Sequence, residues 1–292
     1  MYDRILIPTD GSEGSIRAVN RGLGVAKSFD ADVHVLYVVD SRLFGGMDLA
    51  DEEELERTAR GSGRQAITVV RERAAELGLE ITQRVTVGVP HADIMEYVES
   101  NDIDLVAMGT HGRIGADLAA LGSTTERVLQ RADVPVLTVR LSGELDQGRG
   151  SFDAEVDDIL VPTDGSDASM RAAEHAIGFA DQYGATLHAL YVVDTSIFEF
   201  EDAPRSILGT LRDGGEDAVS EIDSLASDAA ISATVSIDEG NPAELILGYA
   251  DDIDAELLAL GRRGRTGLPE VLLGSTIARV VRVSETPVLS VT

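Results

Sequence analysis

The 292-residue sequence contains no cysteine and no tryptophan, and only one of its 24 basic residues is a lysine, Lys27. The absence of cysteine excludes disulfides, thiolate metal sites, iron–sulfur clusters and cysteine nucleophiles. No apolar run approaches the roughly 18 residues that a membrane span requires. The first residues, Met1 to Arg4, carry neither a basic leader nor a cleavage signal. We therefore expect a cytoplasmic protein without a membrane span.

Acidic residues greatly outnumber basic ones. The chain has 52 Asp and Glu against 24 Lys and Arg, a formal net charge of -28. A surface this acidic repels nucleic acid, so we expect no nucleic-acid partner. At molar salt the Debye length falls to about 3 Å, which removes most of the repulsion between surface carboxylates. The composition therefore favours a halophilic protein; the alternative is an acidic protein from a low-salt cytoplasm.

Segments of the first half of the sequence recur in the second half in the same order, which indicates an internal duplication. The pairs read DRILIPTDGS (3–12) and DDILVPTDGS (157–166), HVLYVVD (34–40) and HALYVVD (188–194), and ADVPVLTVR (132–140) and SETPVLSVT (284–292). Between the halves lies a polar, glycine-containing stretch, as expected of a linker. The expected domains are residues 1–140 and 156–292, joined by a linker over 141–155.

Hydrophobic periodicity alternates between strand and helix within each half. In the first half, short apolar segments predict strands, and segments with apolar residues at helical spacing predict helices. Gly61-Ser62-Gly63 predicts a break in the second helix. Five strands alternating with helices predict a parallel sheet covered on both faces. The expected fold class is α/β, with two tandem doubly wound domains. The predicted strands are 5–7, 33–39, 81–87, 105–108 and 136–139, and the predicted helices are 12–29, 49–77, 91–100 and 124–131.

The loop after the first strand is a candidate binding loop, because ligands of such sheets bind beyond the carboxyl ends of the strands. It reads Thr9-Asp10-Gly11-Ser12, and the second copy reads Thr163-Asp164-Gly165-Ser166. A carboxylate held there can accept hydrogen bonds from a ribose or from an adenine amino group. The alternative is a turn or helix cap, positions that Asp and Ser both favour.

A glycine pattern follows the fourth strand. Gly109-Thr110-His111-Gly112 is separated by nine residues from Gly122-Ser123, and Gly261-Arg262-Arg263-Gly264 by nine from Gly274-Ser275. Glycine lets backbone N–H groups approach an anion, and each Gly-Ser pair precedes a helix, whose N-terminus favours phosphate. The pattern is not a P-loop, which requires a lysine that is absent here.

Ser123 offers a competing structural interpretation. Together with Glu126 it has the spacing of a helix capping box. The second copy keeps the Gly-Ser pair but has Ala278 in place of the glutamate. The retained pair without the box favours phosphate binding over capping.

Together these two motifs resemble the universal stress protein (UspA-like) family, over both halves and nearly the whole chain. The resemblance implies a five-stranded parallel sheet of the adenine nucleotide alpha hydrolase type, an adenine-nucleotide site and dimerisation through the last strand. Tandem members pair their two domains within one chain, so we expect intrachain pairing and a homodimer. The glycine pattern is that of the ATP-binding branch, so the expected cofactor is ATP with Mg²⁺.

The resemblance assigns nucleotide contacts by position. The backbone of Val38 and of Val192 is expected to bind the adenine. Arg113 and Arg265 either attract the triphosphate or are solvated loop charges. The residues implied for the first site are Thr9, Asp10, Val38, Gly109, Gly112, Arg113, Gly122, Ser123 and Thr124. Those for the second are Thr163, Asp164, Val192, Gly261, Gly264, Arg265, Gly274, Ser275 and Thr276. Because Arg262 and Arg263 replace Thr110 and His111, we expect the two sites to differ in affinity.

The sequence provides no recognisable catalytic set or metal site. His111 has the best loop position, but no nucleophile and orienting residue can be named around it. We therefore expect an ATP-binding regulator with one site per domain and little or no catalysis. One alternative is a slow ATPase or self-phosphorylating enzyme, with Ser123 or Ser275 as acceptor. Another is an interaction module that regulates a transporter or another partner independently of nucleotide.

Overall fold

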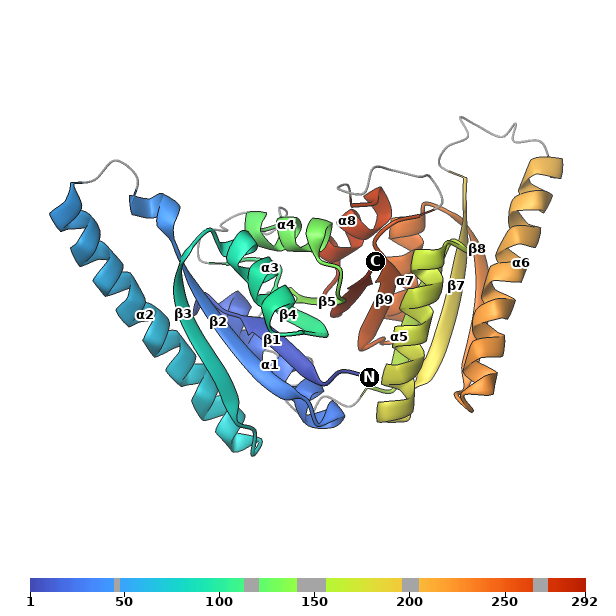
Figure 1. Cartoon of the computed structure of the whole chain (residues 1–292). Coiled ribbons are helices and arrows are strands. Elements are labelled where there is room, and N and C mark those ends of the chain that lie inside the picture. The colour runs from blue at the N-terminus through green and yellow to red at the C-terminus, as the bar shows by residue number, and fades with distance from the viewer. Residues whose placement is uncertain (45–47, 113–120, 141–155, 196–204, 265–272) are drawn as a thin grey trace. The chain divides into compact units, whose positions relative to one another are not determined.

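The computed structural model describes residues 1–44, 48–112, 121–140, 156–195, 205–264 and 273–292 (Figure 1). The chain divides into two compact units, Met1–Ala154 (unit 1) and Glu155–Thr292 (unit 2). The expected linker, 141–155, lies outside the described residues, so the exact domain boundaries stay a prediction.

Unit 1 contains five parallel strands in the order β3-β2-β1-β4-β5. The strands are β1 (Arg4–Pro8), β2 (Asp32–Asp40), β3 (Ile81–Gly88), β4 (Leu105–Gly109) and β5 (Val136–Val139). The helices are α1 (Glu13–Phe29), the 3₁₀ helix η1 (Ser41–Phe44), α2 (Leu49–Glu76), α3 (Pro90–Ser100) and α4 (Ser123–Arg131).

Unit 2 repeats this arrangement, with its parallel strands in the order β8-β7-β6-β9-β10. The strands are β6 (Asp158–Thr163), β7 (Thr186–Asp194), β8 (Ala233–Gly240), β9 (Leu257–Gly261) and β10 (Val288–Val291). The helices are α5 (Asp167–Tyr183), α6 (Arg205–Asp228), α7 (Pro242–Asp252) and α8 (Ser275–Val283).

Helices cover both faces of each sheet. In unit 1, α1 packs on β1 and β4 and α2 on β2 and β3, whereas α3 and α4 lie side by side on the opposite face (Figure 1). The strands between these two layers of helices form the core. Ile5, Leu6 and Ile7 of β1 are completely buried. The predicted fold class, two tandem doubly wound α/β domains, is therefore confirmed. Among the described residues, none of the helices combines the length and apolar character needed to cross a membrane.

The predicted break at Gly61-Ser62-Gly63 is wrong, because α2 runs without interruption from Leu49 to Glu76. Gly63 is required by packing. A Cβ on this residue would lie 2.6 Å from Cδ1 of Tyr37, a buried ring on β2. The same contact recurs in unit 2, where a Cβ on Gly215 would lie 2.5 Å from Cδ1 of Tyr191. Glycine therefore lets a long helix approach an aromatic ring of the sheet.

The two glycines of α2 provide a matched test of this packing. Gly61→Ala should raise the unfolding free energy by about 0.5–1 kcal/mol, because alanine favours the helix and nothing lies within 4 Å of the added Cβ. Gly63→Ala gains the same propensity but overpacks Tyr37, so it should lower the unfolding free energy by about 1–3 kcal/mol. Denaturant unfolding of both variants measures the difference. Equal effects of the two substitutions would show that the contact with Tyr37 is unimportant.

Candidate functional site

Two loops of each unit meet where the direction of winding reverses. In unit 1 this reversal lies between β1 and β4, which are neighbours in the sheet although far apart in sequence. In unit 2 it lies between β6 and β9. The loops that follow these strands at their carboxyl ends contain both sequence motifs, and this is the position at which doubly wound sheets bind ligands.

The loop from β1 to α1 is a tight turn that holds a carboxylate. Ser12 is the N-cap of α1, and its Oγ accepts a hydrogen bond from the Ser15 N–H at 3.2 Å. The same residue donates from its N–H (3.0 Å) and from its hydroxyl (2.6 Å) to Oδ1 of Asp10. The turn or cap expected as an alternative is therefore present, and it fixes the position of Asp10.

Unit 2 repeats this turn with one difference. The Oγ of Ser166 accepts from the Ser169 N–H at 3.3 Å, and the Ser166 N–H donates to Oδ1 of Asp164 at 3.1 Å. The Ser166 hydroxyl, however, donates to the carbonyl of Arg263 at 3.3 Å or to the hydroxyl of Ser169 at 3.4 Å. The copies thus hold the same carboxylate with different hydrogen bonds.

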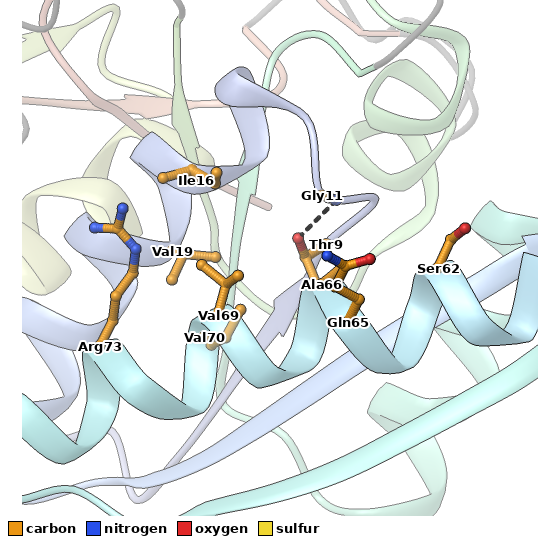
Figure 2. Close-up of a pocket in the computed structure, with 10 residues that line it drawn as sticks. All are labelled: Thr9, Gly11, Ile16, Val19, Ser62, Gln65, Ala66, Val69, Val70 and Arg73. Atoms are coloured by element: carbon orange, nitrogen blue, oxygen red, sulfur yellow. Dashed lines mark hydrogen bonds between the residues drawn. The ribbon is translucent and has the colours of Figure 1, made fainter.

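Thr9 lies behind the loop, at a hollow of about 230 Å³ between α1 and α2 (Figure 2). Its side chain is buried, and its Oγ1 accepts from the Gly11 N–H at 3.1 Å and lies 3.0 Å from the Ser15 hydroxyl. At the other end of the hollow Arg73 donates to Asn20 at 2.8 Å. The hydroxyl of Thr9 is therefore used inside the turn; Thr163 makes the same contacts, with Gly165 at 3.0 Å and Ser169 at 2.9 Å.

The glycines of the second motif bring the two loops into contact. A Cβ on Gly109 would lie 2.8 Å from the carbonyl oxygen of Gly14, and one on Gly112 would lie 2.5 Å from Oδ2 of Asp10. In unit 2 a Cβ on Gly261 would lie 2.7 Å from the Ser169 backbone nitrogen. One on Gly264 would lie 2.6 Å from Oδ2 of Asp164. Side chains at these positions would separate the loops.

The helices that follow these loops begin without a side-chain cap. Gly122 is the N-cap of α4, and its N–H donates to the Thr110 carbonyl at 2.9 Å. Since Ser123 already lies within the helix, the capping box with Glu126 that was considered from sequence does not form. Gly274 caps α8 in the same manner and donates to the Arg262 carbonyl at 3.1 Å. Both helices thus present first-turn N–H groups for which the described residues supply no side-chain acceptor.

The remaining predicted contacts are only partly described. Val38 and Val192 lie near the ends of β2 and β7 and are half-buried. Alternation along the strand places Val38 on the face opposite Tyr37 and α2. Ser123 and Ser275 are exposed, and Thr124 and Thr276 are half-buried. Arg113 and Arg265 lie outside the described residues, so their proximity to the site stays a prediction.

The copies differ in the residues between the glycines, as the sequence showed. Thr110 and His111 are both buried, and the Thr110 hydroxyl lies 2.9 Å from His111 Nδ1. Arg262 is only 3% exposed and donates through Nη2 to the carbonyl of Ser290 at 3.1 Å. One nitrogen of its guanidinium therefore bonds a backbone carbonyl of β10. Sequence reasoning missed the roles of Thr110 and Arg262, since both act through a backbone carbonyl that no residue type reveals.

No group of three or more His, Asp or Glu side chains in the described part of the chain is arranged to hold a metal ion. The histidines of the second strands are structural. His34 Nδ1 lies 3.0 Å from the Tyr97 hydroxyl, and burial holds the pKa of His34 below its usual value. His188 Nε2 lies 2.7 Å from a carboxylate oxygen of Asp158.

One protein family matches both units of the chain. The model of the Universal stress protein family matches residues 1–140 and 155–292. Universal stress protein MJ0531 of Methanocaldococcus jannaschii is 39% identical over 141 residues, which are 48% of this chain and 83% of that protein. MJ0577 of the same organism is 28% identical over 155 residues, 48% of this chain and 96% of that protein. A universal stress protein from Archaeoglobus fulgidus has the same fold, with a TM-score of 0.74, 24% identity and coverage of 99% of this chain and 96% of its own.

Two serine substitutions test whether the turn around Asp10 contributes to stability. Ser12→Ala removes a helix cap and the bonds to Asp10, so the unfolding free energy should fall by about 1 kcal/mol. Ser62→Ala lies inside α2, where the serine only bonds back to the Thr58 carbonyl, so it should be neutral or slightly stabilising. Guanidinium unfolding of both variants checks the opposite signs. A neutral Ser12→Ala would contradict the assigned cap.

Proposed function

Because the chain belongs to the universal stress protein family, we propose that each unit binds one adenine nucleotide where its two loops meet. The ligand is ATP with Mg²⁺, and its occupancy of the two sites acts as a signal with little or no catalysis. The domain boundaries at 140 and 156, the pairing of last strands within the chain and the homodimer remain predictions from the sequence.

The observation that carries this proposal is the glycine N-cap without a side-chain acceptor, which occurs in both units. Other helices of the chain, such as α1, α5 and α7, have a serine or asparagine cap that accepts a first-turn N–H. A bound phosphate accepts hydrogen bonds from such N–H groups and is stabilised by the helix dipole. The proposed phosphate contacts are Gly109, Gly112, Gly122, Ser123 and Thr124, and Gly261, Gly264, Gly274, Ser275 and Thr276.

The opposite end of each site suits a nucleoside. Asp10 and Asp164 are fixed by their own turns, so they can accept hydrogen bonds from a ribose hydroxyl or an adenine amino group without rearrangement. We assign the remaining adenosine contacts to Val38 and Val192 and to the backbone of Thr9 and Thr163, whose hydroxyls are used inside the turns. Arg113 and Arg265 are proposed to offset the strong negative charge of the chain beside the phosphates.

Gly274→Asp separates binding from folding at the second site. Gly274 has φ -58° and ψ 148°, and its nearest neighbour, the Arg262 carbonyl oxygen, would lie 3.3 Å from an added Cβ. Aspartate is a good N-cap, so stability should stay within about 1 kcal/mol of the parent. Its carboxylate would occupy the phosphate position and repel the ligand. Calorimetric titration with ATP and Mg²⁺ in molar KCl should show two sites per parent chain and one in the variant.

Gly248→Asp is the matched control, since it adds the same charge to unit 2 at an exposed position on α7 with open space around it. It should leave both sites intact. Absence of saturable ATP binding by the parent protein would contradict the proposal. An equal loss of ATP binding in Gly274→Asp and Gly248→Asp would show that net charge causes the effect, and it would contradict the assigned site.

Self-phosphorylation is a second candidate function, favoured by the exposed hydroxyls of Ser123 and Ser275 in the first turns of α4 and α8. The serine oxygen would form a bond to the γ-phosphorus of ATP as the bond to ADP breaks, and the hydroxyl proton would pass to solvent. Incubation with ATP should then add one phosphate mass at each serine, and Ser123→Ala with Ser275→Ala should abolish both additions. An unchanged intact mass of the parent protein after incubation would contradict self-phosphorylation. It would not bear on the proposal that the protein binds ATP.

A further inference from the structure

A groove between α2 and β3 is lined by four arginines. Its volume is about 360 Å³, and it lies within unit 1, away from the two loops described above. Arg84 lines the groove with its backbone, because alternation along β3 places its side chain on the opposite face of the sheet. The chain has 24 basic residues against 52 acidic ones, so the three arginine side chains of α2 along one groove are a strong local concentration of positive charge. The lining residues are Arg60, Arg64, Ile67, Thr68 and Arg71 of α2, and Gln83, Arg84 and Val85 of β3.

Two of the three arginine side chains on α2, those of Arg64 and Arg71, are not neutralised by the described residues. Arg60 pairs with Glu56 on the same helix at 2.7 Å. Arg64 and Arg71 are exposed and have no acidic partner in the described part of the chain. Arg84 does not add to this charge, since its guanidinium lies on the α3 face of the sheet, 5.9 Å from the centroid of the Tyr97 ring. The groove therefore presents guanidinium groups that can bind carboxylates in a bidentate manner.

The second copy shows that the fold does not require this charge. Aligning Gly63 with Gly215, which make the same tyrosine contact, places Glu216 at the position of Arg64 and Asp223 at that of Arg71. The strand register places Ser236 at the position of Arg84. Arg212, the equivalent of Arg60, pairs with both Glu216 (3.8 Å) and Glu239 (3.4 Å). The same two elements thus pack with opposite charge, so the arginines of unit 1 are not needed for packing.

The shape of the groove suits an extended chain. Residues 60 to 71 of a helix rise by about 16 Å, and Arg60 and Arg64 are about 6 Å apart along the axis. Alternate side chains of an extended peptide are about 6.8 Å apart, a similar spacing. In the described part of the chain β3 pairs only with β2, so its outer backbone groups are available to a further strand. Ile67 and Val85 supply an apolar floor.

We propose that this groove binds an acidic segment of a partner protein in extended conformation, with its carboxylates on Arg64 and Arg71. A nucleic acid fits less well. Single strands need exposed aromatic rings for stacking, and none of the residues that line the groove is aromatic. A long polyanion would also meet the acidic surface of the rest of the chain.

Fluorescence anisotropy with the full-length protein tests this proposal. The probe is a labelled ten-residue peptide of alternating Glu and Val, compared with alternating Gln and Val, alternating Lys and Val, and a labelled oligothymidylate. The glutamate peptide should bind with one site per chain at about 0.1 M salt. Its affinity should fall as salt rises, because the charges are exposed. Stronger binding of the oligothymidylate would overturn the peptide assignment, and no saturable binding of the glutamate peptide would overturn the groove as a site.

Single charge reversals on α2 locate the site. Arg64→Glu, which copies the residue of unit 2, should weaken peptide binding by about tenfold through loss of a bidentate pair and added repulsion. Arg57→Glu makes the same charge change at an exposed position on the same helix outside the groove, and should weaken binding by about twofold or less. Equal losses would show attraction to net charge alone and would overturn the proposal.

A gain of binding in unit 2 provides an independent measurement. The double variant Glu216→Arg and Asp223→Arg places the charges of Arg64 and Arg71 on the equivalent positions of α6. Its circular dichroism spectrum should match that of the parent, and the number of peptides bound per chain should rise from one to two. A folded double variant that still binds one peptide contradicts the assignment of Arg64 and Arg71 as the binding determinants.

Discussion

The close backbone contact between the end of β4 and the start of α1 is the constraint on which the site depends. Gly109 approaches the Gly14 carbonyl so closely that a Cβ would lie 2.8 Å from it, and Gly261 approaches the start of α5 in the same manner. This contact places the second loop on the first, so that Gly112 reaches Asp10 and the Thr110 carbonyl reaches Gly122. Residues 110–112 thereby connect the fixed carboxylate of Asp10 to the N-terminus of α4.

The duplication separates what the fold requires from what it only permits. Both units keep the glycine contacts, the aspartate turn and the glycine against the tyrosine, so these features belong to the architecture. The pair Thr110 and His111 becomes Arg262 and Arg263 without a change in the backbone bond to the following helix. The groove of α2 and β3 changes from basic to acidic between the copies. The packing is the same in both units, so residues that differ between them can give the two units different ligands or partners.

Much of the fold could be predicted from the sequence, because hydrophobic periodicity reports burial directly. The predicted strand 136–139 coincides with β5, and no end of the other elements predicted in the first half differs from the observed one by more than one residue. The failures have a common cause. Gly61 and Gly63 resemble a helix break when only local propensity is considered, but Gly63 is fixed by Tyr37, which is distant in sequence. Likewise, Ser123 and Glu126 have the spacing of a capping box, but the helix begins with Gly122 as its cap.

The candidate site was predictable as far as its motifs, whereas the arginine groove was not. Arg60 and Arg64 are adjacent on a helix by spacing, but they border a groove only because β3 packs beside α2. The two proposed anion sites also rely on different physics. Backbone N–H groups carry no net charge, and they bind phosphate by short, directed hydrogen bonds that salt screens little. Exposed arginines attract carboxylates over a Debye length, about 10 Å at 0.1 M salt and about 3 Å at 1 M. Rising salt should therefore weaken carboxylate binding in the groove more steeply than phosphate binding at the loops. The ionic strength around the protein thus decides which of the two anions it can bind.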